Sequence, residues 1–406
     1  MSTLEQAKSK CAKYGQEQLL KYYDELNDKE KEALLQQIEE TDFGVIERAF
    51  HQGGKGKITP IKALTAKEIE ANRAKFETIG IDAIKKGKVA AVLLAGGMGT
   101  RLGSDSPKGC FNMGVTRELY IFECLINNLM DVVRKADTFV HLFVMTSDKN
   151  HEATMEFFKE HEYFGYKGEY VHFFKQEMAP ATDMNGKILL EDKGRLATSP
   201  NGNGGWFSSL YHSGLDMCIK EEGIEWLNVF AVDNVLQRMA DPVFVGATID
   251  GGFTSGSKVI KKAARDEKVG VICLEDGHPS IVEYYELTDE LMNEKFPDGS
   301  YAYDYGVILN YLFKVEELEK IIDNPLPLHI VDKKIPCIDE AGNPVAPTEP
   351  NGHKYETLIL DMIHMMKDNL PFEVIREKEF APVKNKEGID SVVSARELLT
   401  KNGVKL

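Results

Sequence analysis

Two basic residues accompany a glycine-rich segment near residue 100. The segment Ala95-Gly-Gly-Met-Gly-Thr-Arg-Leu-Gly103 holds four glycines and Arg101, and Lys108 follows in Ser106-Pro-Lys-Gly109. Glycines let the backbone approach a ligand closely and turn its N–H groups toward an anion. Two cations beside such a loop suit a polyphosphate and would stabilise the charge that develops when it is cleaved. The pattern therefore predicts a site that cleaves a nucleoside triphosphate.

The spacing of this loop differs from that of other phosphate-binding motifs. From Gly97 the glycines are spaced G-x-G-x-x-x-G, whereas the dinucleotide fingerprint needs G-x-G-x-x-G. The P-loop pattern G-x-x-x-x-G-K-[ST] is absent from the sequence, as is the H-R-D motif that accompanies a kinase loop. A dinucleotide-binding dehydrogenase, a P-loop enzyme and a protein kinase are therefore disfavoured.

A buried strand must position the loop. Val89-Ala-Ala-Val-Leu-Leu94 is a continuous apolar run directly before it, which is typical of a strand buried on both faces. Similar runs lie at 139–145, 225–232 and 269–274, and helix-like stretches lie at 120–134 and 152–160. This alternation predicts an α/β fold with a doubly wound, mixed but mainly parallel sheet. Ligands of such sheets bind beyond the carboxyl ends of the strands, where the loop lies.

Three consecutive parts are expected along the chain. Residues 1–88 have the pattern of a helical region, with capping-box signatures at Asn27-Asp-Lys-Glu30 and Thr65-Ala-Lys-Glu68. Residues 89–320 are expected to form the nucleotide-binding α/β domain. Beyond residue 320 prolines recur and a helix-like stretch returns at 355–367, so residues 321–406 are expected to form a small C-terminal domain.

Composition excludes several classes of partner. The 406 residues carry a net charge of −16, which argues against nucleic acid and against an anionic membrane surface. No apolar run approaches the roughly 18–20 residues that span a bilayer, and the start lacks a signal-peptide core, so a cytoplasmic protein is expected. The six cysteines are scattered without a C-x-x-C pair, which argues against a zinc site or a disulfide framework. The sequence leaves monomer and homo-oligomer open.

The glycine loop and a series of later segments resemble the eukaryotic UDP-sugar pyrophosphorylases. The matching segments are 94–103, 107–109, 145–148, 151–154, 173–176, 186–191, 199–205, 232–234, 282–284, 333–336, 350–352 and 380–385. The resemblance covers nearly the whole chain and is greatest to the members that act on N-acetylglucosamine 1-phosphate. It implies a nucleotide-diphospho-sugar transferase fold and a uridylyltransferase that makes UDP-N-acetylglucosamine and pyrophosphate from UTP and N-acetylglucosamine 1-phosphate.

The resemblance also implies a role for each matching residue. Nucleotide contacts fall on Leu94, Ala95, Gly96, Gly97, Lys108, Gln176, Gly202, Asp233 and Lys354. Sugar contacts fall on Asn203, Gly270, Glu283 and Tyr284. Arg101, Lys108 and Lys384 would be the catalytic cations, and Asp233 would hold Mg²⁺. The residue types suit these roles, because a glutamine amide matches the edge of uracil and Mg²⁺ prefers oxygen ligands.

Three positions depart from the family pattern on the sugar side. Val307 stands where the family has a sugar-contacting asparagine, and Leu358 and Leu360 stand where aromatic residues are usual. A valine side chain cannot form a hydrogen bond to a sugar hydroxyl or acetamide. N-acetylgalactosamine 1-phosphate and glucose 1-phosphate therefore remain alternative substrates, and a nucleotide-sugar-binding protein without turnover remains a second class.

Overall fold

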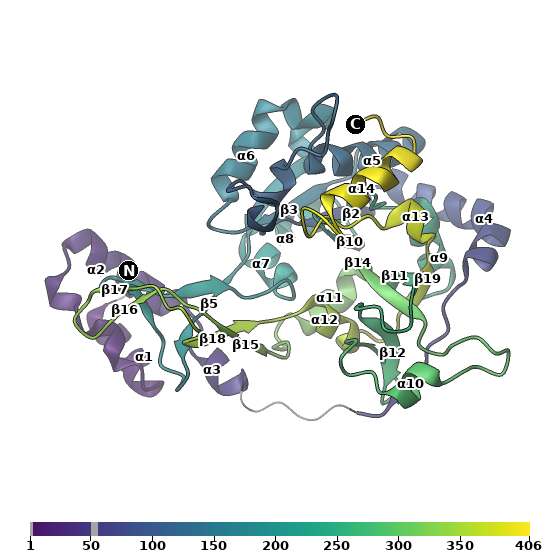
Figure 1. Ribbon diagram of the computed structural model, residues 1–406. Helices are drawn as coiled ribbons and strands as arrows, with labels where there is room; N and C mark the ends of the chain where they lie inside the picture. Colours follow the sequence, from purple (N-terminus) through teal and green to yellow (C-terminus); the bar gives the residue numbers. More distant parts are fainter. Residues whose placement is uncertain (1–2, 50–55) are drawn as a thin grey trace. The chain divides into compact units, whose positions relative to one another are not determined.

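The computed structural model describes residues 3–49 and 56–406, which belong to two compact units (Figure 1). Unit 1 comprises Met1–Gly54, Glu177–Gly205 and Pro325–Asp361. Unit 2 comprises Lys55–Gln176, Trp206–Asn324 and Met362–Leu406. This division differs from the expected parts 1–88, 89–320 and 321–406, because each unit is assembled from three separate stretches of chain.

Unit 1 consists of short helices and strands around small apolar cores. Its helices are α1 (Leu4–Lys13), α2 (Asp28–Glu40) and α3 (Gly44–Ala49). Its strands are β5 (Met178–Pro180), β6 (Thr182–Asp183), β7 (Leu190–Asp192), β8 (Arg195–Leu196), β9 (Thr198–Pro200), β15 (His329–Lys333), β16 (Cys337–Ile338), β17 (Pro344–Val345) and β18 (Gly352–Glu356). The predicted capping box of α2 is confirmed: the Asn27 side chain accepts from the Glu30 N–H, and the Glu30 carboxylate accepts from the Asn27 N–H.

A ten-stranded mixed sheet forms the centre of unit 2. Its strands are β1 (Ile58–Thr59), β2 (Val89–Leu94), β3 (Leu142–Thr146), β4 (Val171–Lys175), β10 (Trp226–Ala231), β11 (Ser255–Lys261), β12 (Val271–Glu275), β13 (His278–Val282), β14 (Tyr305–Lys314) and β19 (Leu370–Glu373). The main path runs β1-β12-β14-β10-β2-β3-β4. Strands β10, β2, β3 and β4 are parallel, whereas β14 runs antiparallel to β10, β11 and β12. The predicted mixed α/β fold is confirmed.

Helices flank this sheet (Figure 1). They are α4 (Ala66–Lys85), α5 (Ile121–Ala136), α6 (His151–Glu160), α7 (Trp206–His212), α8 (Asp216–Glu221), α9 (Pro242–Asp250), α10 (Asp289–Asn293), α11 (Val315–Ile321), α13 (Arg376–Glu379) and α14 (Val392–Lys401). α12 (Ile359–Met365) spans the boundary between the units. It is the helix expected at 355–367, but Tyr355 itself lies in β18.

Close packing between α4 and α9 explains why the first long helix joins unit 2. The α4 capping box predicted at Thr65 and Glu68 is present. A Cβ on Gly80 of α4 would lie 1.9 Å from the Pro242 carbonyl oxygen, and one on Gly246 of α9 would lie 1.8 Å from that of Phe76. Only glycine permits this approach of the two backbones. α4 is therefore part of the nucleotide-binding unit rather than of a separate N-terminal region.

The carboxyl ends of β2 and β10 lie next to each other in the sheet. From β2 the chain continues through α5 to β3 on one side, while β10 pairs with β2 on the other side. Leu94 pairs with Ala231, and the Val232 N–H donates to the Leu94 carbonyl at 3.1 Å. The segments that follow these two strands therefore begin side by side and diverge, which is where doubly wound sheets bind ligands.

In the described part of the chain, every helix is too short or too polar to cross a membrane.

Candidate active site

The glycine loop after β2 folds back on itself. The Gly99 N–H donates to the Ser106 carbonyl at 2.9 Å, and the Lys108 N–H donates to the Gly97 carbonyl at 3.1 Å. These bonds bring Lys108 to the start of the loop, while exposed Arg101 lies in the turn between them. Among the described residues, the N–H groups of Gly96 and Gly97 have no protein acceptor. The loop therefore offers backbone donors and two cations to an anion.

Two residues that sequence reasoning missed hold the loop in place. The Ser147 hydroxyl donates to the Gly96 carbonyl at 2.9 Å, and the buried Asn150 amide donates to the Ala95 and Gly97 carbonyls at 2.9 and 3.3 Å. By binding the carbonyl groups, they leave the N–H groups of the loop for a ligand. Both residues follow β3, the strand next to β2. Their position just beyond the end of that strand is the sequence signal that could have identified them.

Four of the predicted charged side chains act on one another. Burial lowers the pKa of the Lys108 ammonium, Lys384 and Arg101 lower it further, and Asp233 raises it. The net direction is downward, so the positive charges and the loss of water outweigh the single carboxylate. Asp233 directly follows Val232 at the end of β10, as the sequence predicted. Lys108 therefore lies close enough to Arg101, Lys384 and Asp233 for their charges to act on its ammonium.

The C-terminal segment is fastened to the loop that carries Asp233. The Val383 N–H donates to the Asp233 carbonyl at 2.8 Å, and Asn234 forms a β-bridge with Pro382. The Asn234 side chain also accepts from the Ala381 N–H at 2.8 Å. These bonds fix the backbone next to Lys384. Its ammonium pairs with the Asp390 carboxylate at 3.0 Å.

Gln176 lies directly against the glycine loop. It follows β4, is 8% exposed, and donates its N–H to the Thr146 carbonyl. A Cβ on Gly96 would lie 2.4 Å from Nε2 of Gln176, so the amide packs on the glycine backbone. The close approach fixes the amide beside the loop and requires glycine at this position.

Three residues of the expected sugar side also lie together. A Cβ on Gly270 would lie 3.6 Å from Cγ2 of Val307 and 3.9 Å from Oε1 of Glu283. The Val307 N–H donates to the Gly270 carbonyl at 2.9 Å. Tyr284 follows Glu283 and is 39% exposed. Val307 is therefore next to the proposed sugar ligands, so its departure from the family pattern falls within the site.

The other expected ligands lie in unit 1. Gly202 adopts φ +87°, which only glycine takes up readily, and the Asn203 side chain accepts from the Ile359 N–H at 2.9 Å. Leu358 and Leu360 lie on either side of Ile359. Lys354 lies in β18, opposite Val331 of β15. Each has a defined place within that unit.

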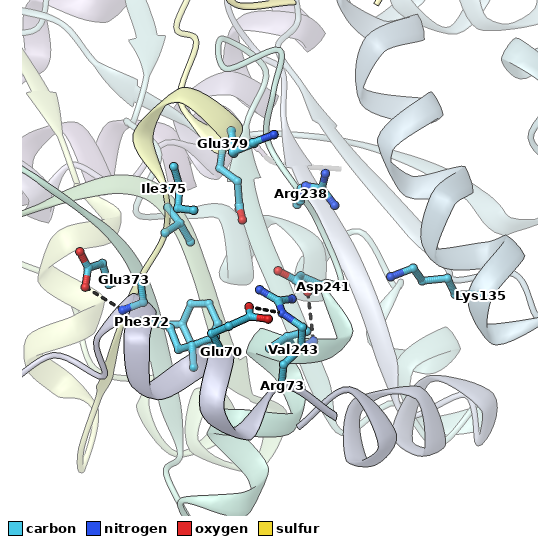
Figure 2. Close-up of a pocket in the computed structure, with 14 residues that line it drawn as sticks. Glu70, Arg73, Lys135, Arg238, Asp241, Val243, Phe372, Glu373, Ile375 and Glu379 are labelled. Atoms are coloured by element: carbon cyan, nitrogen blue, oxygen red, sulfur yellow. Dashed lines mark hydrogen bonds and ion pairs between the residues drawn. The ribbon is translucent and has the colours of Figure 1, made fainter. Parts of the chain in front are cut away.

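A cavity of about 430 Å³ lies elsewhere in unit 2, with charged side chains from α4, α9 and α13 on its walls (Figure 2). Its lining residues include none of the predicted site residues. Beside it, the ammonium of Lys258, a residue with 0% exposure, lies 2.9 Å from Asp241 and 2.6 Å from Glu379. This buried triad links β11, the N-cap of α9 and α13. We infer that it stabilises the fold and takes no part in catalysis.

The fold and the site together define a nucleotide-binding α/β protein with a cationic glycine loop. A sequence profile described as UTP–glucose-1-phosphate uridylyltransferase matches residues 43–403. The chain belongs to this family.

Individual relatives are consistent with membership of this family. UDP-N-acetylhexosamine pyrophosphorylase-like protein 1 of Xenopus tropicalis is 35% identical over 95% of this chain and 81% of its own length. UDP-N-acetylglucosamine pyrophosphorylase of Saccharomyces cerevisiae is 34% identical over 92% of this chain and 84% of its own. The crystal structure of the enzyme of that name from Trypanosoma brucei has a TM-score of 0.84 and is 26% identical, covering 99% of this chain and 85% of that one. The resemblance to UDP-sugar pyrophosphorylases is confirmed.

Proposed function

We propose that this protein is a uridylyltransferase that converts UTP and N-acetylglucosamine 1-phosphate to UDP-N-acetylglucosamine and pyrophosphate. The observation that carries the proposal is that Lys108, bonded to the glycine loop, lies within electrostatic reach of Arg101, Lys384 and Asp233, beyond the paired carboxyl ends of β2 and β10. Relatives named for this activity support the choice of substrates. The acidic composition and the lack of a membrane-spanning helix among the described residues support a cytoplasmic enzyme with small-molecule partners.

The chemistry needs positioning and charge stabilisation rather than a covalent nucleophile. An oxygen of the sugar phosphate is already an anion, so it attacks the α-phosphorus of UTP in line without a general base. The new P–O bond forms as the bond to the bridging oxygen of pyrophosphate breaks, and pyrophosphate leaves with those electrons. The main obstacle is the approach of two anions. Arg101, Lys108 and Lys384 would offset that repulsion.

A magnesium ion fits the residues at this site. Mg²⁺ is commonly held by one or two carboxylates together with waters and substrate phosphates, and Asp233 supplies one carboxylate two residues beyond the end of β10. When bound, the ion would neutralise phosphate charge. Asp233 would hold it, and Lys108, whose pKa responds to Asp233, would contact the same phosphates.

Product analysis with a panel of sugar 1-phosphates tests the proposal directly. Purified protein with UTP and Mg²⁺ should release pyrophosphate with N-acetylglucosamine 1-phosphate, and less with N-acetylgalactosamine 1-phosphate or glucose 1-phosphate. Tight binding of UDP-sugars without release of pyrophosphate from any substrate would favour the binding-protein alternative.

Gly96→Ala should impair selection of the base. The new Cβ would displace the Gln176 amide, which lies 2.4 Å from its position. If Gln176 reads uracil, the preference for UTP over CTP in kcat/KM should fall by about tenfold, the value of roughly one hydrogen bond. Gly97→Ala is the comparison, because a Cβ there would meet no atom within 4 Å. The Gly97→Ala variant should keep the preference for UTP over CTP even if its turnover falls. An equal loss of this preference in both variants would contradict the role of Gln176 in reading the base.

Val307→Asn should improve use of the acetamido sugar. An asparagine beside Gly270 and Glu283 would supply the hydrogen bond that valine lacks, worth roughly 2- to 12-fold in kcat/KM for N-acetylglucosamine 1-phosphate. Val307→Leu has a similar size without a polar group and should give no gain. A gain confined to glucose 1-phosphate would instead identify glucose as the preferred sugar.

A further inference from the structure

We propose that His141, His172 and Cys218 form a binding site for a divalent transition-metal ion, with Zn²⁺ as the preferred ligand. One ligand atom from each residue lies within 4.8 Å of the others. Nδ1 of His141 is 2.9 Å from Nε2 of His172, and Sγ of Cys218 is 3.9 Å from the same Nε2. A nitrogen and sulfur donor set of this kind suits Zn²⁺ rather than Mg²⁺ or Ca²⁺.

The spacing is close to that of a formed tetrahedral site. With Zn–N near 2.0–2.1 Å and Zn–S near 2.3 Å, neighbouring ligand atoms lie about 3.3–3.6 Å apart. The two imidazoles must separate by a few tenths of an ångström, the thiol must approach Nε2 of His172 by a similar amount, and it must come within the same range of Nδ1 of His141, which lies within 4.8 Å of it. These are side-chain adjustments, so the backbone already places the three ligands.

Three separate elements bring the ligands together on one face of the sheet. His172 of β4 pairs with Phe143 of β3, and His141 lies two residues before Phe143. Because side chains alternate along a strand, His141 and Phe143 share a face, and the rings of His141 and His172 stack at 5.2 Å. Cys218 comes from α8, 46 residues beyond His172. The scattered cysteines argued against a zinc site in the sequence, and this proposal differs from that expectation because the spacing of cysteines cannot reveal a site with a single cysteine.

Glu222 supplies the outer partner that metal-bound histidines usually have. Its carboxylate lies 3.8 Å from Nε2 of His141, which is the ring nitrogen that faces away from the cluster. With Nδ1 on the metal, Nε2–H would donate toward Glu222 and fix the ring in the ligating tautomer. Glu222 lies four residues after Cys218, so the end of α8 contributes both a ligand and its support.

The protonation states agree with metal binding. A hydrogen bond between Nδ1 of His141 and Nε2 of His172 requires a lone pair on one of these nitrogens, so at least one ring is neutral. Burial lowers the pKa of both imidazoles, which favours their neutral form, and it raises the pKa of the Cys218 thiol, so the ion must displace that proton. Zn²⁺ would displace the thiol proton of Cys218, as it does when it binds cysteine in other proteins.

The metal would link α8 to the amino-terminal ends of the parallel strands. His141 and His172 stand at the starts of β3 and β4, whereas the glycine loop and Gln176 lie beyond the carboxyl ends. Four strand residues, a length of roughly 13 Å, separate the amino-terminal ends of the strands from their carboxyl ends. The ion is therefore expected to stabilise the unit and not to take part in nucleotidyl transfer.

Cobalt spectroscopy of the full-length protein tests the site. The reduced, metal-free protein should bind one equivalent of Co²⁺ with a thiolate-to-cobalt charge-transfer band, and Zn²⁺ should displace it and raise the melting temperature. Cys218→Ser should abolish the band, and His172→Gln should weaken Zn²⁺ binding at least 100-fold. Cys337→Ser and His278→Gln alter a thiol and an imidazole elsewhere and should retain the wild-type band and affinity.

Glu222→Gln separates a metal site from a merely packed cluster. Loss of the outer carboxylate should weaken Zn²⁺ binding about 10- to 100-fold while the charge-transfer band remains. The proposal is overturned if the wild-type protein shows no such band with Co²⁺ and no thermal shift with Zn²⁺. It is equally overturned if the band persists in Cys218→Ser. Since these readouts do not involve UTP, they are independent of the proposed transferase activity.

Discussion

Replacing Lys108 with methionine should reduce the rate of pyrophosphate release by about 10²–10³-fold, the usual effect of removing one preorganised charge stabiliser. The backbone of Lys108 bonds to Gly97 of the glycine loop, and the charges of Asp233, Lys384 and Arg101 act on its ammonium. Its pKa is lowered in the folded protein, chiefly by burial, so its charge opposes folding. The substitution should therefore leave thermal stability unchanged or slightly raised, and kcat/KM and melting temperature should be measured on the same sample.

Arg101→Met should lower the rate to a similar extent, because both cations face the same phosphates in the proposed reaction. Lys86→Met is the matched control, since that lysine pairs with Asp82 on the surface of α4 and should leave turnover unchanged. Near-normal turnover in both Lys108→Met and Arg101→Met would show that the glycine loop is not the triphosphate site.

Replacing Lys258 with methionine should lower the free energy of unfolding by about 3–5 kcal/mol, because it leaves two buried carboxylates without their cation. Burial opposes the charged form of Lys258, but Asp241 and Glu379 raise its pKa overall. Figure 2 shows that Asp241 and Glu379 come from different elements beside the cavity. Urea unfolding followed by far-UV circular dichroism gives the change.

Two further variants separate charge from packing in this triad. Lys258→Met combined with Asp241→Asn and Glu379→Gln removes all three charges and should recover much of the loss, since neutral replacements of buried ion networks are often tolerated. Lys75→Met breaks the more exposed pair with Asp250 and should cost no more than about 1 kcal/mol. A loss of that size for Lys258→Met would show that water reaches the triad.

Local signals in the sequence were sufficient for the glycine loop and for β2, β3 and β10 of the parallel half of the sheet, whereas β4 was not predicted. The predicted strand Val89–Leu94 coincides with β2, because a continuous apolar run before glycines has few other interpretations. The capping boxes were predictable for the same reason, because each is formed by residues that lie close together in the sequence. The division into units was not predictable, since Glu177–Gly205 and Pro325–Asp361 join unit 1 through contacts that lie far apart in sequence.

The supporting residues of the site were also hidden from sequence reasoning. Ser147 and Asn150 are ordinary polar residues in the sequence, and only the pairing of β2 with β3 places them against the loop carbonyls. Lys258 has the appearance of a solvent-exposed lysine, yet its surroundings bury it completely. For Ser147 and Asn150 the position just beyond a predicted strand was the available signal, whereas neither the type nor the spacing of Lys258 indicates its burial.

The bonds from the Asp233 loop to residues 381–383 have a consequence for synthesis of the protein. Ribosomes make the glycine loop some 280 residues before Lys384, at about 5–20 residues per second. Strand β19, which pairs with β11, and the segment that carries Lys384 are made much later. A nascent chain should therefore lack the complete proposed phosphate site until residue 384 has been made. Proteolytic trimming before residue 380 would return the protein to that incomplete state.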